Sequence, residues 1–268
     1  MFRVKEKALV ILSGGQDSTT CLFWARTRFD EVHAITFDYG QRHSIEIGAA
    51  KHVAEMAKIA SHEIIQVPNC LKSTSPLTSD NSLEKYTGAE QMEKVIGNRV
   101  ELTFVPMRNQ LFFTVAMNRA VALGCENLVT GICQEDNANY PDCTEDFRRA
   151  FETCSNISLG TAVWDGEKSK DIQNRFKLHA PLMWLSKMES VIMAYSMPEC
   201  WEALAYTHTS YDGKYPPTDM NHANVLRAQG FERAGLPDPL VIRAYLEGFM
   251  DLPDTSNYEE LQNSADGK

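Results

Sequence analysis

The stretch that decides the fold is Ser13-Gly14-Gly15-Gln16-Asp17-Ser18-Thr19. A short apolar run, Ala8 to Leu12, comes directly before it, and a helix-like sequence begins at Ser18. A strand, a glycine-containing loop and a helix in this order are typical of a doubly wound sheet, which binds ligands at the carboxyl ends of its strands. Two glycines let the backbone approach an anion, and three hydroxyl side chains add donors near the positive end of the helix. The stretch therefore predicts a phosphate-binding loop.

This loop is not one of the two common nucleotide-binding motifs. It matches neither the GxxxxGK[ST] pattern nor the GxGxxG pattern. The simpler alternative is a helix that is capped by a serine after a glycine turn and that binds no ligand. The position of the loop directly after a buried strand favours phosphate binding.

Further strands and helices extend this first unit. Residues 32–37 and 63–67 have the apolar character of buried strands, and residues 44–57 between them have the length and apolar spacing of a helix. A second helix is expected over 110–123, followed by a buried strand over 128–132. Parallel strands joined by helical crossovers are the natural arrangement for this alternation. We therefore predict an α/β fold with a doubly wound, mostly parallel sheet.

The chain divides by its sequence character into three parts. Residues 1–200 are expected to form the α/β domain, and residues 201–258 a smaller helical lobe packed on it. Residues 259–268 are polar and acidic, which favours a disordered tail. Within the first part, residues 69–98 have no clear period, and we interpret them as a surface excursion that orders over a substrate.

Composition and charge argue against several classes of function. The 268 residues carry a formal net charge of −10, whereas proteins that wrap a nucleic acid backbone need an excess of Lys and Arg. The longest apolar runs fall well short of the roughly 20 residues that cross a bilayer, and the first residues lack the features of a secretory signal. The seven cysteines are scattered without a CxxC pair, which indicates free thiols in a reducing compartment. We expect a cytoplasmic protein that binds neither nucleic acid directly nor a membrane.

Three further polar segments, residues 37–43, 104–109 and 131–143, border predicted strands or helices at the edge of the sheet that carries the loop. An arginine there can bind phosphate through two nitrogens, and carboxylates with a tyrosine can bind the edge and face of a purine-like ring. The alternatives are a solvated turn, helix capping by Asn109 and a solvated loop, respectively. The candidate side chains are Phe37, Tyr39, Arg42, Arg108, Asn109, Gly131, Gln134, Asp136, Tyr140 and Asp142.

These segments and the loop, with Ala180-Pro181-Leu182-Met183-Trp184-Leu185-Ser186-Lys187, resemble the 7-cyano-7-deazaguanine synthase family of N-type ATP pyrophosphatases. The resemblance extends from about Val10 to Asp238, with the motifs in the same order along the chain as in the family. It implies a PP-loop fold that uses ATP and Mg²⁺. It also implies a reaction in which 7-carboxy-7-deazaguanine is adenylated and converted with ammonia to the amide and then the nitrile, on the way to queuosine.

The resemblance also implies a role for each candidate. The loop from Ser13 to Thr19 holds pyrophosphate, and Asp17 holds magnesium. Lys187 stabilises the charge that grows on the leaving pyrophosphate, and it forms the catalytic set with Asp17 and Arg108. The remaining ATP-binding residues are Phe37, Tyr39, Arg42, Asn109 and Gly131, and the substrate-binding residues are Tyr39, Gln134, Asp136, Tyr140 and Asp142.

The sequence departs from the family near its C-terminus, where members usually carry a zinc knuckle of four cysteines. Ser210, Thr218, Asn221 and Asn224 stand at those positions. Neutral hydroxyl and amide oxygens are poor zinc ligands beside thiolate, so we expect no zinc. A replacement site made of His208, Asp212, Asp219 and His222 is the alternative.

Three functions remain in view. The first is the nitrile synthase, which acts on a small 7-deazaguanine with ammonia and is expected to be a homodimer. The second is a divergent relative that joins the deazaguanine acid to a protein amine in antiphage defence. The third is a sensor that binds ATP without turnover, against which the intact Asp17 and Lys187 argue.

Overall fold

The fold is built on a parallel sheet. The computed structural model describes residues 5–40, 45–67, 70–79, 81–134, 139–161 and 175–266. Within these residues five strands lie in the order β3-β2-β1-β4-β5, all neighbours parallel. Their bounds are β1 Lys7–Ile11, β2 Glu31–Asp38, β3 Ser61–Gln66, β4 Asn127–Val129 and β5 Lys177–His179. The chain adds β2 and β3 on one side of β1 and then returns to add β4 and β5 on the other, which confirms the predicted doubly wound sheet.

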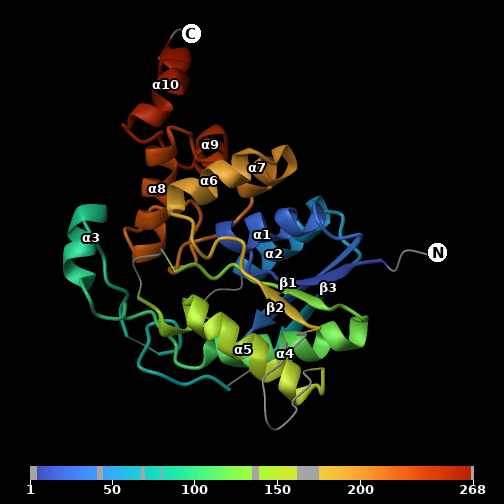
Figure 1. Ribbon diagram of the computed structural model, residues 1–268. Coiled ribbons are helices and arrows are strands. Elements are labelled where there is room, and N and C mark those ends of the chain that lie inside the picture. The colour runs from blue at the N-terminus through green and yellow to red at the C-terminus, as the bar shows by residue number, and fades with distance from the viewer. Residues whose placement is uncertain are drawn as a thin grey trace.

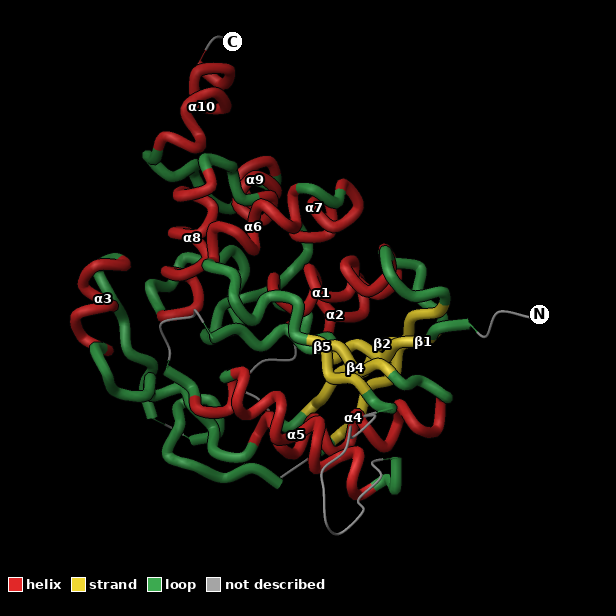
Figure 2. Tube along the Cα trace, viewed as in Figure 1, coloured by secondary structure: helices red, strands yellow, loops and turns green. Residues whose placement is uncertain are grey.

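Helices cover both faces of this sheet (Figures 1 and 2). Neighbouring residues of β1 point to opposite faces, because Ala8 and Val10 pack in one apolar cluster and Leu9 in the other. A strand covered on both faces is apolar throughout, which explains the continuous run in the sequence. The first cluster is formed with α1 Gln16–Arg26, α2 Ile45–Met56, α6 Lys187–Tyr195 and α7 Pro198–Leu204, and the second with α4 Arg108–Leu123 and α5 Glu145–Ser158.

The C-terminal helices pack beside α6 and α7, away from α4 and α5 (Figure 1). Arg227 on α8 forms a buried ion pair with Asp238, with 2.6 Å between Nε and a carboxylate oxygen, and it also donates to the Thr207 and Thr209 hydroxyls. The remaining bounds are α8 His222–Ala234, α9 Pro239–Leu246, α10 Glu259–Asp266 and the 3₁₀ turns η1 Pro141–Cys143 and η2 Ser256–Tyr258. Among the described residues, no helix combines the length and apolar character that a membrane span requires.

The excursion over residues 69–98 contains a helix that the sequence did not indicate. Helix α3, Ala89–Ile96, buries Met92 and Ile96 against Val225 and Leu226 of α8. An eight-residue helix with two buried apolar positions is too short to produce a convincing period. Part of the excursion is therefore anchored to the C-terminal helices.

Several boundaries differ from the expectations, including α1, which begins at Gln16 instead of Ser18, and β3, which begins at Ser61 instead of residue 63. Residues 259–266 form α10 instead of the disordered tail expected there, because glutamates in its first turn suit a helix N-terminus even though the segment buries little. Helix α4 begins at Arg108, two residues before the predicted start, after Met107 adopts a left-handed conformation with φ 64°. Strand β4 ends at Val129, before the predicted Ile132, since the chain then turns toward α1.

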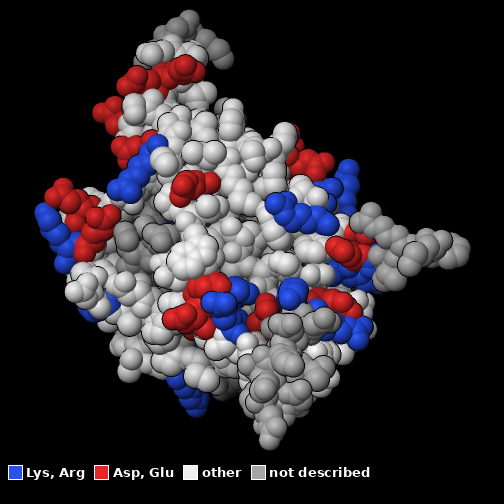
Figure 3. All heavy atoms as spheres, viewed as in Figure 1, with Lys and Arg blue, Asp and Glu red and all other residues white. Residues whose placement is uncertain are grey.

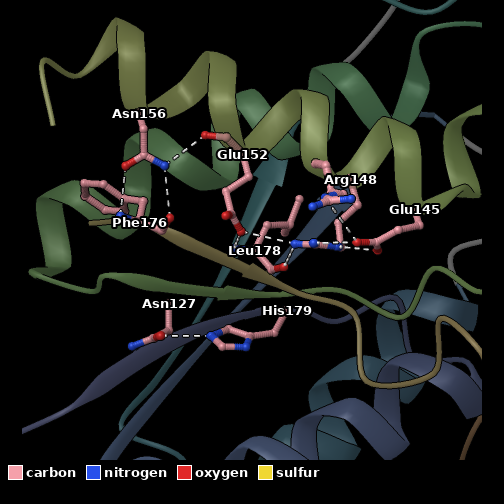
Figure 4. Close-up of polar contacts among 9 residues, drawn as sticks. Asn127, Glu145, Arg148, Glu152, Asn156, Phe176, Leu178 and His179 are labelled. Atoms are coloured by element: carbon pink, nitrogen blue, oxygen red, sulfur yellow. Dashed lines mark hydrogen bonds and ion pairs between the residues drawn. The ribbon is translucent and has the colours of Figure 1, made fainter. Parts of the chain in front are cut away.

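Side chains of α5 fix the last strand (Figure 4). The Asn156 amide nitrogen donates to the Phe176 carbonyl at 3.0 Å, and its oxygen accepts from the Phe176 N–H at 3.0 Å. Glu152 accepts from the Leu178 N–H at 2.8 Å, and Arg148 donates to the Leu178 carbonyl at 2.7 Å. Helix α5 thus holds β5 with four hydrogen bonds as well as through the apolar contact of Phe151.

Candidate active site at the carboxyl ends of the strands

The predicted phosphate loop joins β1 to α1 at the carboxyl end of the sheet. The residue that caps α1 is Gly15, and no side chain caps the helix. The Ser18 hydroxyl instead accepts from the Ser13 N–H and donates to the Gly15 carbonyl, each at 3.1 Å. The simpler alternative, a helix capped by a serine, is therefore wrong. Ser18 closes the loop on itself and leaves the first N–H groups of α1 directed at the space beyond it.

Two glycines are required here by close backbone contacts. Gly14 has φ 88°, and a Cβ atom on it would lie 2.5 Å from the Glu46 carbonyl oxygen of α2. A Cβ atom on Gly131, which follows β4, would lie 3.0 Å from the Ser18 nitrogen. The loop is thus supported by α2 on one side and by the segment after β4 on the other. Larger residues at these positions would displace backbone rather than a flexible side chain.

Lys187 reaches the loop from α6. Its ammonium lies 2.9 and 3.1 Å from the two carboxylate oxygens of Asp17, and the two side chains are 13% and 27% exposed. Ser186, the N-cap of α6, and Glu189 form a capping box, which fixes the start of the helix at Lys187. Gly230 of α8 allows the contact between α6 and α8, because a Cβ there would lie 2.5 Å from the Lys187 Cγ. Lys187 is thereby directed toward the phosphate loop.

A cavity of about 680 Å³ opens in front of the loop. Gly14, Thr19 and Asp142 do not line it, Thr19 and Asp142 being buried behind the wall. Arg42 and Asp136 lie outside the described residues. The predicted residues that line the cavity are Ser13, Gly15, Gln16, Asp17, Ser18, Phe37, Tyr39, Arg108, Asn109, Gly131, Gln134, Tyr140 and Lys187.

Arg108 stands in the cavity wall beside aromatic hydroxyls. Burial opposes its charge, but the neighbouring Tyr39, Tyr140 and Asp142 hold the pKa of Arg108 above its ordinary value. Burial raises the pKa of Tyr39 and of Tyr140, so both phenols are neutral near pH 7. Arg108 therefore supplies a permanent positive charge in the wall of the cavity.

The segment after β4 supports the cavity as well as lining it. Asn109 does not cap α4, because its amide nitrogen donates to the Asp142 carbonyl at 3.3 Å and so holds η1 in place. The Gln134 carboxamide oxygen accepts from the Glu145 N–H at 3.0 Å. The Tyr140 hydroxyl bonds to Thr103 and Glu101, and its ring lies 5.5 Å from that of Phe104. These contacts fix the wall from behind while leaving the Tyr140 ring at the cavity.

Sequence reasoning missed several residues of the cavity. Glu46 lines it from the first turn of α2, and Thr209 and Tyr211 line it from the segment before α8. Two further residues that line the cavity, Gln16 and His222, each have a buried Nε2 atom that has no hydrogen-bond partner among the described residues. The predicted order of strands and helices could have indicated Glu46, since it begins the first helix after β2.

Three of the four positions where the family carries cysteine meet in one hydrogen-bonded cluster. The Ser210 hydroxyl accepts from the amide nitrogens of Asn221 at 3.2 Å and Asn224 at 2.8 Å. It donates to Asp212 at 2.5 Å. Ser210 and Asn221 are each 1% exposed, whereas Thr218 lies on the surface and does not join them. We call Ser210, Asp212, Asn221 and Asn224 the Ser210 cluster.

These residues do not fit the family's zinc. The Ser210 cluster holds one carboxylate, already bonded to Ser210, and otherwise neutral oxygens and nitrogens. The alternative ligands do not converge either, because Asp219 pairs with Lys85 at 2.7 Å and His208 donates to the Ser210 carbonyl at 2.8 Å. Over the described part of the chain, no three His, Cys, Asp or Glu side chains are grouped as a metal site. Hydrogen bonds therefore connect this segment where a metal would in the family.

Charges of both signs are interspersed on the face drawn in Figure 3. Arg148 lies against Glu145 at 2.7 Å, Arg99 against Glu84 at 2.6 Å and Arg175 against Glu126 at 2.5 Å. Exposed pairs of this kind contribute little stability, and they cancel rather than concentrate charge.

The fold and the cavity define a nucleotide-binding enzyme of the α/β class, with a glycine-containing phosphate loop at the point where the strand order reverses. The family described as "Queuosine biosynthesis protein QueC" matches residues 7–235 of the chain. Because this match covers most of the sequence, the chain belongs to that family.

Curated relatives agree with this assignment. A 7-cyano-7-deazaguanine synthase of Laribacter hongkongensis is 43% identical over 241 residues, which are 90% of this chain and 96% of the relative. One of Gloeobacter violaceus is 42% identical over 88% of this chain and 95% of the relative. One of Chromobacterium violaceum is 40% identical over 90% of this chain and 96% of the relative.

Solved structures resemble the chain more remotely. A 4-thiouridine synthetase bound to RNA and ATP is 14% identical with a TM-score of 0.44, over 84% of this chain and 53% of that one. An NMN synthetase of Francisella tularensis is 14% identical with a TM-score of 0.40, over 94% of this chain and 81% of that one. The family assignment rests on the family match and the sequence relatives.

Proposed function

We propose that this chain is an ATP-dependent 7-cyano-7-deazaguanine synthase that forms AMP and pyrophosphate at each of two stages. It adenylates the carboxylate of 7-carboxy-7-deazaguanine and replaces AMP by ammonia. It then adenylates the amide oxygen and eliminates AMP to leave the nitrile. The observation that carries the proposal is the phosphate loop with its Lys187–Asp17 pair, in a chain 43% identical to a protein of that name.

The phosphates of ATP fit the loop end of the cavity. The glycine-supported backbone and the Ser13 and Ser18 hydroxyls surround the space in front of α1, and the buried Gln16 amide lacks a partner there. Lys187 and Arg108 stabilise charge on the phosphates, which is greatest as pyrophosphate leaves. Magnesium, held by Asp17, supplies further charge compensation when bound.

The deazaguanine fits the far wall, where the sheet edge carries polar and aromatic groups. Tyr39 and Tyr140 offer ring faces, and Gln134 and Asn109 offer amides. Asp142 sits behind this wall with a pKa raised by burial, so we assign it the support of η1 rather than direct contact. Neither alternative function, protein conjugation or ATP sensing, is supported by the comparisons.

Mass spectrometry of the reaction tests the proposal. The purified chain with 7-carboxy-7-deazaguanine, ATP, Mg²⁺ and ammonia should give the nitrile, with the amide as a transient product and AMP as the nucleotide product. Omission of ammonia should abolish both nitrogen-containing products. Formation of ADP, or no change in the deazaguanine, would show that the proposed function is wrong.

A further inference from the structure

We propose that Glu46 accepts protons from the reacting nitrogen in both stages of the reaction, from the incoming ammonia in the first and from the amide nitrogen in the second. The proposal rests on the proposed function and assigns a new residue to it. Glu46 belongs to α2. It is therefore not part of the phosphate loop, the Lys187–Asp17 pair or the far wall described above.

The position of Glu46 meets the geometric requirement. Its backbone carbonyl lies directly under Gly14, and the residue lines the cavity between the phosphate loop and Arg108. A carbonyl carbon joined to the α phosphate must lie beside the loop, so a group in this part of the wall can reach the nitrogen that attacks it. Glu46 is half-buried, which leaves its carboxylate accessible from the cavity.

Glu46 is also chemically distinct from the other acid of the cavity. Among the described residues that line the cavity, Asp17 and Glu46 are the carboxylates. Lys187 contacts both oxygens of Asp17, so that side chain is already engaged by a cation. No hydrogen bond or ion pair joins the Glu46 carboxylate to another described residue, so it is available to a substrate proton.

The electrostatic environment suits a group that takes up and releases a proton. Burial raises the pKa of Glu46 to about 7, against the opposing effect of Arg108. Among the described residues, the titratable groups that face it are Arg108 from α4 and Tyr39 directly after β2, with Asp17 and Lys187 elsewhere in the wall. A base with a pKa near the working pH is the most effective one.

The proton transfers balance in both stages. Ammonia forms the C–N bond at the carbonyl carbon, Glu46 takes one proton from that nitrogen, and the C–O bond to AMP breaks to give the amide. In the second stage the amide oxygen displaces pyrophosphate from ATP. The nitrogen then gives up its protons, one at a time through Glu46 to solvent, as the C–O bond to AMP breaks and the nitrile forms.

The test separates adenylation from nitrogen transfer in Glu46→Gln, which keeps the shape of the side chain. Without ammonia, exchange of labelled pyrophosphate into ATP reports adenylation alone, and we expect it to change less than threefold. With a fixed concentration of unprotonated ammonia, amide and nitrile formation should fall about 100-fold or more. Glu55→Gln, an exposed change on the same helix, is the matched control and should leave every rate unaltered.

A pH profile gives an independent result. The wild-type nitrogen-transfer rate should rise with pH and level off above about 7, since Glu46 must be ionised to accept a proton. This rise of the rate with pH should be absent in Glu46→Gln and retained in Glu46→Asp. Equal loss of exchange and transfer, or an unchanged rise of the rate with pH, would overturn the role of Glu46. Failure of the wild-type chain to exchange pyrophosphate or make amide would instead refute the proposed function.

Discussion

The phosphate loop lines the cavity, whereas the Ser210 cluster lies next in sequence to Thr209, Tyr211 and His222, which line it, and the two are held in place by different means. The loop depends on backbone contacts that only glycine allows, at Gly14 and Gly131, and on the charge pair of Lys187 with Asp17. The Ser210 cluster depends on hydrogen bonds from two neutral amides to the Ser210 hydroxyl, which in turn donates to the Asp212 carboxylate. The two regions are connected through His208. Its backbone N–H donates to the Gly14 carbonyl at 2.9 Å, and its ring Nε2–H donates to the Ser210 carbonyl.

The difference teaches which parts of such a site can be replaced. A Cβ atom on Gly14 or Gly131 would lie 2.5 or 3.0 Å from backbone atoms of α2 or α1, so a side chain at either position would force the backbone to shift. A metal that joins two chain segments performs a mechanical task that buried hydrogen bonds can also perform. We therefore expect the phosphate loop to take part in the chemistry of ATP, and the Ser210 cluster to support the chain segments that it joins.

The largest expected effect comes from breaking the charge pair. Lys187→Ala and Asp17→Asn should each lower ATP-dependent pyrophosphate release 30-fold or more, since a contact that strengthens in the transition state contributes about 2 to 4 kcal/mol. Pyrophosphate release with 7-carboxy-7-deazaguanine measures the effect. Lys94→Ala, at a site 74% exposed, is the control and should be neutral. Normal turnover in both pair variants would remove Lys187 and Asp17 from the mechanism.

A smaller effect should follow from breaking the cluster. Ser210→Ala leaves the buried amides of Asn221 and Asn224 without their acceptor, which should lower the free energy of unfolding by about 1 to 3 kcal/mol. Urea denaturation measures it, with the exposed Ser158→Ala as the control. A strong chelator should leave the melting temperature of the wild-type chain unchanged. Stoichiometric zinc that is lost together with stability would show that a metal organises this segment after all.

The smallest effect should come from the contact of α8 with Lys187, the residue that faces the phosphate loop. Gly230→Ala forces the Lys187 side chain to move, because the added Cβ would lie 2.5 Å from its Cγ. A displaced ammonium should lower turnover about tenfold, which corresponds to roughly 1.4 kcal/mol. Gly48→Ala on α2, where nothing lies within 4 Å, controls for a helical glycine change. Equal rates in the two variants would mean that α8 does not position Lys187.

The sequence predicted those features that depend on local pattern. Continuous apolar strands, a glycine loop after the first of them and the Ser186–Glu189 box are all visible without a structure, and the doubly wound sheet follows from them. The strand β5 has three residues and α3 has eight, which is too little for a period to emerge.

Contacts between distant segments were beyond sequence reasoning. Thr19 appeared to belong to the loop, yet the first turn of α1 directs it into the core. The Ser210 cluster joins residues 11 to 14 positions apart, and nothing in the spacing indicates that a hydroxyl would bind two amides. The role of Glu46 depends on its burial beside Arg108, which is a property of the folded chain alone.

The four hydrogen bonds from side chains of α5 to β5 and the residue before it also affect whether this edge of the sheet can pair with other proteins in the cell. β5 is the last strand on its side of the sheet, and such a strand usually offers free N–H and carbonyl groups to any extended chain. Asn156, Glu152 and Arg148 already occupy the outward groups of Phe176 and Leu178. A passing strand would have to displace all four bonds before it could pair, so this border of the sheet is closed to templated aggregation.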